Sequence, residues 1–442
     1  MSQPEPGSSS PQPDDPYAAL RLPDYRFYVL STIIGVIGTQ IQALAVAWEI
    51  YERTKDPLAL AYIGLARALP FFLFGLIAGQ MADWFNRKYL LILSQFTSML
   101  CALGIAALSY YQAPVWCFYA VLFLRASAGT LGMPARQAML PQIVPQNVFT
   151  NAITWNSGTF HLALVIGPAI GGVVLAAGPL YAYLIDAVGL SCAVFFMLFV
   201  KVRSVELKRE PLTLSGFLAG ASFVWNTKIM LATLSLDLFA VLLGGATALL
   251  PIYASEEMLN CGPEGLGWLR AAPAVGSCVM ALLLVYLPPM KNAGRTLLLM
   301  VAGFGAATVL FGISTNFWLS VFMLFLTGVF DQVSVVVRHM LVQVLSPDQL
   351  RGRISAVNSI FIGASNQLGE LESGLAAKFG AAMFSSIAAG AIFSAVTGGI
   401  GTMLVVLGIA IKFPQVAAIG RLEDVKPASA DEPKAEKTAT AA

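Results

Sequence analysis

Residues 57–82, PLALAYIGLARALPFFLFGLIAGQMA, form an apolar run that contains one charged side chain, Arg67. About 20 apolar residues are enough for a helix to cross the roughly 30 Å of hydrocarbon in a bilayer. The run therefore predicts a transmembrane helix, and an arginine near the bilayer centre costs roughly 3 kcal/mol or more. The tetrapeptide RALP at 67–70 returns as RAAP at 270–273, inside another apolar run. Two arginines hidden at matching places predict a polar pathway through the membrane.

The composition of the whole chain supports a membrane location. Of its 442 residues, 57% are hydrophobic and 11% are charged, whereas an ordinary soluble domain has about 25% charged residues. The alternation of polar and apolar residues that marks a transmembrane β-barrel is absent. The fold class that follows is an all-α integral membrane protein.

Neither the net charge nor the cysteines indicate another class of partner. A net charge of +2 is close to neutral and gives no reason to expect nucleic acid. The five cysteines form no CxxC pair, so neither a metal site nor a disulfide framework is expected. No cofactor is expected either.

Apolar runs bounded by turn and charge signals predict twelve transmembrane helices. They lie at residues 26–49, 57–82, 89–110, 115–135, 149–176, 180–200, 229–252, 265–287, 296–314, 317–337, 354–378 and 384–411.

The basic residues predict the orientation of these helices. If the amino terminus is cytoplasmic, the outer loops hold Arg53, Lys55 and Lys378, and three more arginines lie within segments. Every other lysine and arginine then falls in an inner loop or a tail. Because basic loops stay on the cytoplasmic side, both termini are predicted to be cytoplasmic.

The widest polar interruption, residues 201–228, divides six segments from six. It predicts a cytoplasmic linker between an N-terminal half at 25–200 and a C-terminal half at 229–412. Within the linker, 214–225 is either a short helix along the inner membrane surface or an unstructured stretch. Residues 1–24 lack the basic start and apolar core of a signal peptide and are predicted to be a disordered tail. Residues 413–442 are predicted to be a second, largely disordered tail.

An internal repeat relates the two halves. The pair Met-Leu at 139–140 with Pro145 returns at 340–341 with Pro347, and Asn-Ser at 156–157 returns at 358–359. Together with the repeated arginine, these matches predict two pseudo-symmetric six-helix halves of like orientation. In that arrangement a binding site forms near the midplane between the halves, and access alternates by rocking.

The loop between the second and third segments reads GQMADWFNRK at 79–88. It resembles the signature G-x-x-x-D-R-x-G-R-R/K of the major facilitator superfamily, with Trp84 and Asn86 departing from it. The residues that match, and that the resemblance makes a conformational latch, are Gly79, Asp83, Arg87 and Lys88. The corresponding loop of the second half, around 288–295, lacks the acid, so any latch there is expected to be weaker.

Two further stretches resemble motifs of the same superfamily. Arg125-Ala126-Ser127-Ala128-Gly129 is similar to its R-x-x-x-G motif, which implies a role for Arg125 in proton coupling. The GPxxGG core of the antiporter-type exporters matches Gly167, Pro168, Gly171 and Gly172. Their small side chains allow close helix packing, and the proline removes one backbone hydrogen bond.

Residues 361–374 and 134–141 resemble the bacterial branch that includes enterobactin exporters and macrolide efflux proteins. This resemblance implies export of a sizeable organic molecule across the bacterial inner (cytoplasmic) membrane. It also implies a multi-pass protein surrounded by membrane lipids, and we expect a monomer.

Other charged groups also lie in apolar segments. The proton-coupling candidates are Arg125, Asp237, Asp331 and Glu370, and the candidates for cavity or charge-pair roles are Arg67, Arg270, His161 and Glu372. For each charged candidate the alternative is a structural ion pair that only fixes packing, and His161 is more often a hydrogen-bonded core residue. Glu370 and Glu372 face different directions on a helix, so one of them is expected to reach the cavity. Asp186 and Glu49 lie near the outer interface and are expected to be solvated.

The function that these features favour is a secondary active transporter that exports a siderophore- or drug-like molecule, coupled to protons, by alternating access. A GxxxxGK[ST] phosphate loop is absent, which argues against an ATP-driven pump. Two alternatives remain open: a lipid or lysolipid flippase on the same fold, and a non-transporting membrane receptor or sensor. An enzyme is not expected, because HExxH and GxSxG motifs are absent and the two histidines lie on unrelated segments.

Overall fold

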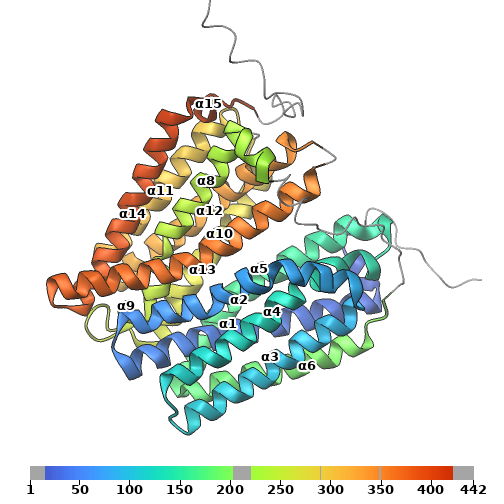
Figure 1. The fold of residues 1–442 in the computed structure, drawn as a ribbon, viewed down its shortest axis with the longest axis horizontal. Coiled ribbons are helices and arrows are strands. Elements are labelled where there is room, and N and C mark those ends of the chain that lie inside the picture. Colours follow the sequence, from blue (N-terminus) through green and yellow to red (C-terminus); the bar gives the residue numbers. More distant parts are fainter. Residues whose placement is uncertain (1–14, 203–220, 289, 348–349, 422–442) are drawn as a thin grey trace, which may run out of the picture.

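The computed structural model describes residues 15–202, 221–288, 290–347 and 350–421, and this part of the chain consists mainly of long helices (Figure 1). The N-terminal half contains η1 (Ala19–Arg21), α1 (Pro23–Thr54), α2 (Pro57–Trp84), α3 (Arg87–Tyr110), α4 (Val115–Ile143), η2 (Gln146–Val148), α5 (Phe149–Ala177) and α6 (Pro179–Phe199). The C-terminal half contains α8 (Lys228–Leu243), η3 (Gly245–Leu249), α9 (Leu250–Ala254), α10 (Gly262–Tyr286), α11 (Ala293–Ile313), α12 (Phe317–Leu345), α13 (Arg351–Phe384), α14 (Ile387–Lys412) and α15 (Pro414–Ala417).

Eleven membrane-spanning segments in the described ranges are long and apolar enough to cross a bilayer. The remaining predicted segment, 354–378, corresponds to α13, which is long enough at 34 residues but carries several charged side chains. Since α13 packs between α2 of one half and α8 and α14 of the other, it takes the twelfth place in the bundle. The predicted twelve-helix fold is therefore confirmed in its outline.

Three predicted segments differ most from the helices at their ends. The fourth continues as α4 to Ile143, because Pro134 and Pro141 lie inside the helix without ending it. The tenth continues as α12 to Leu345. It does not end before the charged Arg338, because that side chain is buried within the protein. The seventh is broken after Leu243 into η3 and α9.

Local sequence explains the tight turn between α1 and α2. Lys55 ends α1 in the left-handed conformation, with φ of 48°. Asp56 then caps α2, and its carboxylate accepts a hydrogen bond of 3.0 Å from the Leu58 N–H. Pro57 occupies the first helical position, where its missing N–H costs nothing. The turn thereby places Asp56 at one end of the molecule.

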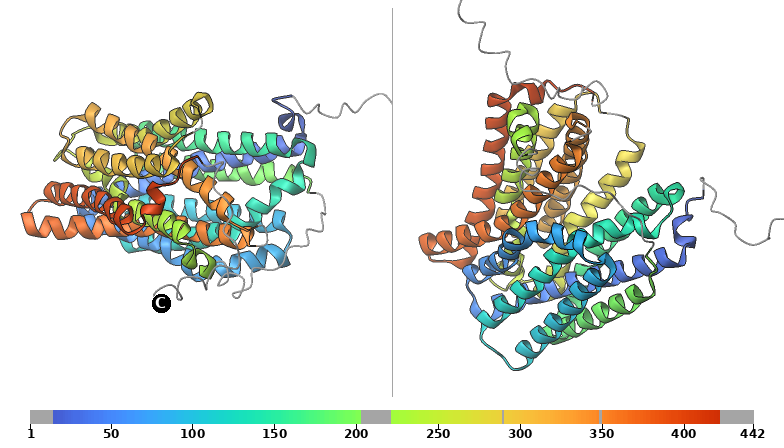
Figure 2. Two further views of the ribbon diagram at one scale, coloured as in Figure 1. Left: turned by 90° about the horizontal axis from the view of Figure 1, so that it is seen from above. Right: turned by 45° about the vertical axis from the view of Figure 1, so that its right-hand side comes forward.

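The two halves are separate helix bundles that share few helix pairs. In the N-terminal half α1 packs against α5 and α6, and α4 packs against α2 and α3. In the C-terminal half α12 packs against α10 and α11, and α14 packs against α11 and α13. The halves meet mainly through α2 with α13 and α5 with α10. Figures 1 and 2 show the bundles converging at one end and diverging at the other.

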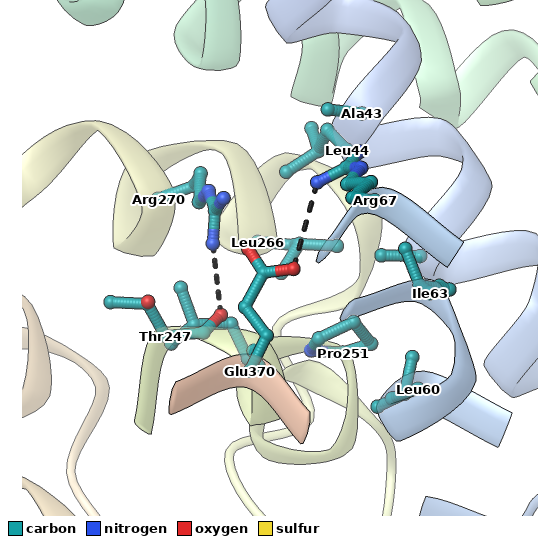
Figure 3. A pocket seen from close by; sticks show the side chains of 13 residues that line it. Ala43, Leu44, Leu60, Ile63, Arg67, Thr247, Pro251, Leu266, Arg270 and Glu370 are labelled. Carbon is teal, nitrogen blue, oxygen red and sulfur yellow. Dashed lines mark hydrogen bonds and ion pairs between the residues drawn. The ribbon is translucent and has the colours of Figure 1, made fainter. Parts of the chain in front are cut away.

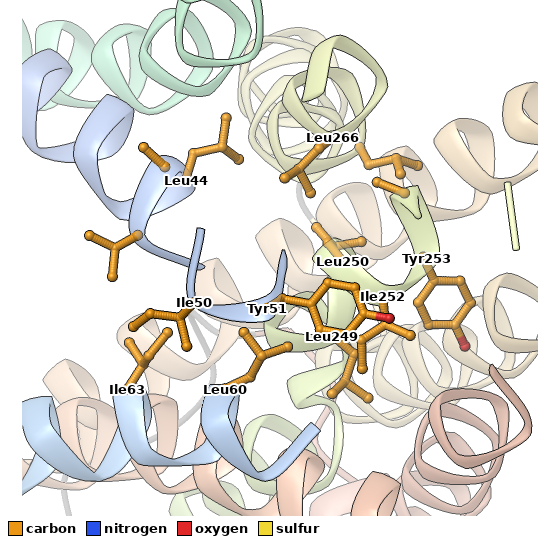
Figure 4. Packing of buried hydrophobic residues seen from close by; sticks show 14 of the residues in the cluster. Leu44, Ile50, Tyr51, Leu60, Ile63, Leu249, Leu250, Ile252, Tyr253 and Leu266 are labelled. Carbon is orange, nitrogen blue, oxygen red and sulfur yellow. The ribbon is translucent and has the colours of Figure 1, made fainter. Parts of the chain in front are cut away.

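The buried apolar clusters identify which end is sealed. One cluster draws on both halves, with Ile50, Tyr51 and Leu60 from α1 and α2 beside Leu249 and Leu250 (Figure 4). Two other clusters each lie within a single half, at the opposite ends of the same helices. We call the sealed end, with the α1–α2 and α13–α14 turns, the closed end. The end with η1 and α15 is the open end.

Residues 15–22 fall within the stretch expected to be a disordered tail, yet they pack on α5. Ala19 is fully buried, and its N–H donates a 3.0 Å hydrogen bond to Asn151 Oδ1. Trp155 Nε1 donates to the Pro16 carbonyl at 2.8 Å. Of the predicted linker, residues 221–226 are helical, whereas 203–220 lie outside the described residues, as do tail residues 1–14 and 422–442.

Candidate functional site

A polar cavity of about 320 Å³ lies in the C-terminal half, between η3, α10, α11, α12 and α13. Polar side chains that line it include Arg270, Ser277, Thr308, Thr327, Asp331, Asn366 and Glu370. An adjoining pocket of about 180 Å³ shares Asp331 and Asn366 with it. A smaller pocket of about 30 Å³ shares Arg270 and Glu370 with it and reaches α1 and α2. The three spaces form one polar track that runs from the interface of the halves into the C-terminal bundle.

The first charge cluster on this track centres on Arg338. Its guanidinium pairs with Asp237 of α8, and its Nη2 lies 3.7 Å from Asp331 Oδ1, two helical turns earlier on α12. The Asp237 side chain is 8% exposed, whereas that of Asp331 is 45% exposed and lines the cavity. One arginine thus serves two acids, and the cluster carries one negative charge in excess when both are ionised.

The second cluster brings together the two arginines that the repeat predicts. Figure 3 shows the Glu370 carboxylate of α13 pointing between Arg67 of α2 and Arg270 of α10. Arg67 Nη1 lies 3.7 Å from Glu370 Oε2, and Arg270 Nη1 donates a 3.0 Å hydrogen bond to the Thr247 carbonyl. Glu372, two positions further on, does not line this pocket, and its Oε2 accepts a hydrogen bond of 3.4 Å from the Ser373 hydroxyl. The arginines therefore share one site, in which Glu370 is the acid.

Arg125 lies away from the cavity and is held in a buried ion pair inside the N-terminal half. Its two terminal nitrogens donate to both carboxylate oxygens of Asp186 on α6, and one also donates to Thr39 Oγ1 at 3.1 Å. Gly38 makes room for this pair, because a Cβ there would lie 3.0 Å from Asp186 Oδ1. Asp186 is fully buried, so the expectation that it is solvated is wrong.

The same expectation is wrong for Glu49. This residue is 5% exposed and forms an ion pair with Arg53. It also accepts hydrogen bonds from the Tyr183 hydroxyl at 2.5 Å and the Ser109 hydroxyl at 2.8 Å. Asp186 and Glu49 lie close to the ends of their predicted segments, which indicates a position at the outer membrane interface. Neighbouring helices nevertheless bury both carboxylates.

His161 is exposed and makes no hydrogen bond among the described residues, so it is not the core histidine expected from the sequence. It lies about three turns before Gly172 and hence on the same face of α5. Gly172 faces α10. His161 therefore lies on the side of α5 that faces the C-terminal half, where the two bundles have diverged.

The GPxxGG motif packs α5 against two helices at once. A Cβ on Gly167 would lie 2.6 Å from Gln40 Cβ of α1, and one on Gly171 would lie 3.3 Å from Ile41 Cα. A Cβ on Gly172 would lie 2.9 Å from Gly267 Cα of α10, across the interface of the halves. Pro168 is buried in the same stretch. Close helix packing at this motif is what the sequence predicts.

The loop at 79–88 joins α2, α3 and α6. Arg87 Nε donates to the Ala82 carbonyl at 3.3 Å, and Lys88 Nζ donates to the Leu198 carbonyl at 2.7 Å. Gly79 lies in the last two turns of α2. The side chain of Asp83, on which the predicted latch depends, lies outside the described residues.

Two charged partners, one on the polar track and one at the closed end, are not evident from the sequence. Arg338 lies one residue beyond the predicted segment 317–337, although its spacing of seven from Asp331 puts both on one helix face. Lys378 is predicted to lie in an outer loop, and at the closed end its Nζ lies 3.0 Å from both Asp56 carboxylate oxygens, which joins α13 to the start of α2. No pattern in a single sequence signals that second pair.

Comparison with known proteins places this architecture in a family. Residues 14–419 match the family model described as a transmembrane secretion effector. The chain belongs to this family of the major facilitator superfamily. The family match covers both halves and the whole polar track.

Its relatives include proteins named as efflux pumps and exporters. The multidrug efflux pump Tap of Mycolicibacterium fortuitum is 24% identical over 351 residues, which cover 76% of this chain and 85% of the pump. The enterobactin exporter EntS of Escherichia coli O81 is 23% identical over 337 residues, covering 76% of this chain and 80% of the exporter. This secretion effector is accordingly a membrane transporter of the efflux type and not an enzyme.

The fold also matches solved transporters. A bacterial homologue of the human lysosomal transporter Spinster, in an inward-facing and occupied conformation, superposes with a TM-score of 0.64 at 15% identity. The match covers 94% of this chain and 100% of that one. At this identity the likeness concerns the fold alone.

Proposed function

We propose that this secretion effector is a proton-coupled exporter that moves a small organic molecule out of the bacterial cytoplasm by alternating access. The apolar seal at one end and the divergence of the bundles at the other support one open side at a time. The open end faces the cytoplasm in this proposal, because most basic residues of the described ranges lie there, whereas Arg53, Lys55 and Lys378 lie at the closed end. Both termini are then cytoplasmic, in the inner membrane.

The observation that carries the proposal is the shared arginine of Asp237 and Asp331. Arg338 keeps its counter-charge in Asp237 when Asp331 takes up a proton, so protonation of Asp331 leaves no buried charge unpaired. Protonation also changes the charge of the cavity that Asp331 lines. A proton and a substrate can therefore compete for the same polar track, as exchange transport requires.

The other coupling candidates receive different roles in this proposal. Arg125 is fully engaged with Asp186 and does not line the polar track, so it fixes α4 against α6. Glu370 is coupled to the bound substrate by its ion pair with Arg67 and by Arg270, which lines the same pocket. His161, exposed on the face of α5 toward the opening, lies at the approach to the cavity. The loop at 79–88 serves as the latch of the N-terminal half at the open end.

The relatives support the choice of substrate class. Tap is named for multidrug efflux and EntS for enterobactin export. We propose a siderophore- or drug-like organic molecule, bound in the polar track by one chain that acts as a monomer within its lipids.

The test uses purified protein in proteoliposomes with an imposed pH gradient. Proton flux is followed with a trapped pH-sensitive dye while siderophore- and drug-like compounds are added. We expect substrate-dependent proton flux in the wild type and its loss in Asp331→Asn, with Glu256→Gln, an exposed acid in a loop, as the matched control. Flux that survives in Asp331→Asn would remove this residue from coupling, and no flux with any compound would argue against antiport.

A further inference from the structure

The pocket between Arg67, Arg270 and Glu370 contains more positive than negative charge. Two guanidinium groups face one carboxylate, which leaves one positive charge in excess. The remaining lining is largely apolar, with Leu44, Leu60, Ile63, Pro251 and Leu266 among the side chains (Figure 3). A charge in such a setting requires a counter-charge, because an apolar environment solvates it poorly.

Most donors of the two guanidinium groups have no protein partner in the described part of the chain. Each group has five N–H donors. Arg270 uses one of its nitrogens on the Thr247 carbonyl, and the Arg67–Glu370 distance of 3.7 Å is that of an ion pair rather than a hydrogen bond. Both arginines line the pocket, and neither has a side-chain nitrogen that is both inaccessible and without a hydrogen-bond partner. The donors are therefore available to a group that enters the track.

The three residues come from three helices that span the interface of the halves. Arg67 lies on α2 of the N-terminal half, whereas Arg270 and Glu370 lie on α10 and α13 of the C-terminal half. Arg270 and Glu370 also line the 320 Å³ cavity, so a molecule in that cavity can reach both. A group bound between the two arginines would consequently contact both halves at the inner face of the closed end.

We propose that Arg67 and Arg270 form a subsite for an anionic group of the substrate, a carboxylate or a similar acidic oxygen group. Glu370 occupies the subsite as an internal counter-ion and is displaced when the substrate anion enters. Guanidinium groups suit this role because their planar donors bind carboxylates bidentately. The inference rests on the proposed function, since it names a chemical feature of the exported molecule, but it is tested by binding rather than by transport.

The experiment compares matched acid and methyl ester pairs for binding to the purified full-length protein in detergent. The panel consists of aromatic carboxylic acids and their methyl esters, with rhodamine 110 and its methyl ester, rhodamine 123, as the fluorescent pair. We expect the wild type to bind at least one acid about tenfold or more tightly than its ester, as one charge-assisted hydrogen-bonded pair allows. Arg67→Gln and Arg270→Gln should each reduce this preference toward unity.

Two further variants separate the subsite from general effects of charge and folding. Glu370→Gln should raise the affinity for the acid, because the internal competitor is lost. Arg295→Gln, which removes an exposed arginine at the open end, should leave the preference unchanged. Ester affinity equal to that of the wild type shows that each arginine variant is folded.

The outcomes distinguish this inference from the proposed function. A wild type that binds no acid more tightly than its ester overturns the subsite, as does a preference that persists in both arginine variants. A preference for acids without proton-coupled movement in proteoliposomes supports the subsite and contradicts the proposed function. Proton-coupled movement of acids and esters that bind with equal affinity supports the proposed function and contradicts the subsite.

Discussion

Arg338 links the two acids of the first charge cluster on the polar track. It holds Asp237 and Asp331 from two helices, and its own side chain is only 10% exposed. Its Nε also donates to the Ser334 carbonyl at 3.2 Å, one turn back on α12. The guanidinium is thus fixed on three sides, and its charge is balanced chiefly by the buried Asp237.

At this scale we predict that Arg338→Gln destabilises the protein strongly. Breaking a buried ion pair by removing one partner costs about 3–5 kcal/mol, because the other charge stays buried without compensation. The thermal unfolding midpoint in detergent should fall clearly, and Arg338→Gln combined with Asp237→Asn should recover part of the loss. An unfolding midpoint of Arg338→Gln equal to that of the wild type would contradict the assigned pairing.

The sequence predicts which residues are charged within the membrane better than it predicts their partners. Arg67 and Arg270 were expected to be equivalent, and the structure places both around one acid. Arg125 was singled out by a motif, but its partner Asp186 was expected in solvent. Ion pairs between helices depend on how the helices pack, and a single sequence does not determine that packing.

At the scale of elements, the crossing of α5 and α10 depends on Gly172 and Gly267. The hypothetical Cβ of either glycine would lie within 3 Å of the Cα of the other, so the backbones touch without side chains between them. This contact belongs to the interface of the halves near the closed end. A side chain here would push the halves apart at the position that seals the molecule.

We predict that Gly172→Val opens the closed end, whereas Gly158→Val on the same helix does not. A Cβ at Gly158 meets no atom within 4 Å, which makes it the matched control. The reporter is Cys261 in the loop before α10, with the other four cysteines replaced by alanine. Burial raises the pKa of its thiol to about 11.

Opening should lower the pKa of Cys261 toward its ordinary value, so that the thiolate fraction at pH 8 rises. Labelling by a membrane-impermeant maleimide should then become about tenfold faster or more in Gly172→Val. The same labelling rate in both valine variants and in the wild type would show that the glycine contact does not govern the seal.

Hydropathy predicts the membrane-spanning helices and most of their bounds. The bounds that it predicts wrongly have a physical cause. The apolar runs predict α2, α3 and α5 closely because lipid contact requires apolar side chains along the whole span. The end of α12 was predicted too early because Arg338 and His339 are polar but face the inner pocket. A polar residue ends a membrane span only if it lies at the surface.

At the scale of the whole molecule, the halves are joined at one end by two kinds of contact. The apolar cluster that includes Tyr51 and Leu250 excludes water there. The ion pairs Lys378–Asp56 and Arg67–Glu370 join α13 to α2. The internal repeat predicts two halves, but it does not predict which end is closed, because under the proposed alternating access the same sequence supports both conformations.

The most direct test of the proposed mechanism is a pair of distances between the halves, measured by double electron–electron resonance in nanodiscs. Spin labels at Tyr89 and Lys291 report on the open end, and labels at Tyr111 and Thr315 report on the closed end. All four positions are exposed at helix ends.

Alternating access coupled to Asp331 predicts that acidification changes the two distance distributions in opposite directions, one end closing as the other opens. The Asp331→Asn background should keep both distributions fixed across the same pH range. Distributions that stay constant in the wild type at every pH and with every bound compound, or two ends that open together, would contradict the account.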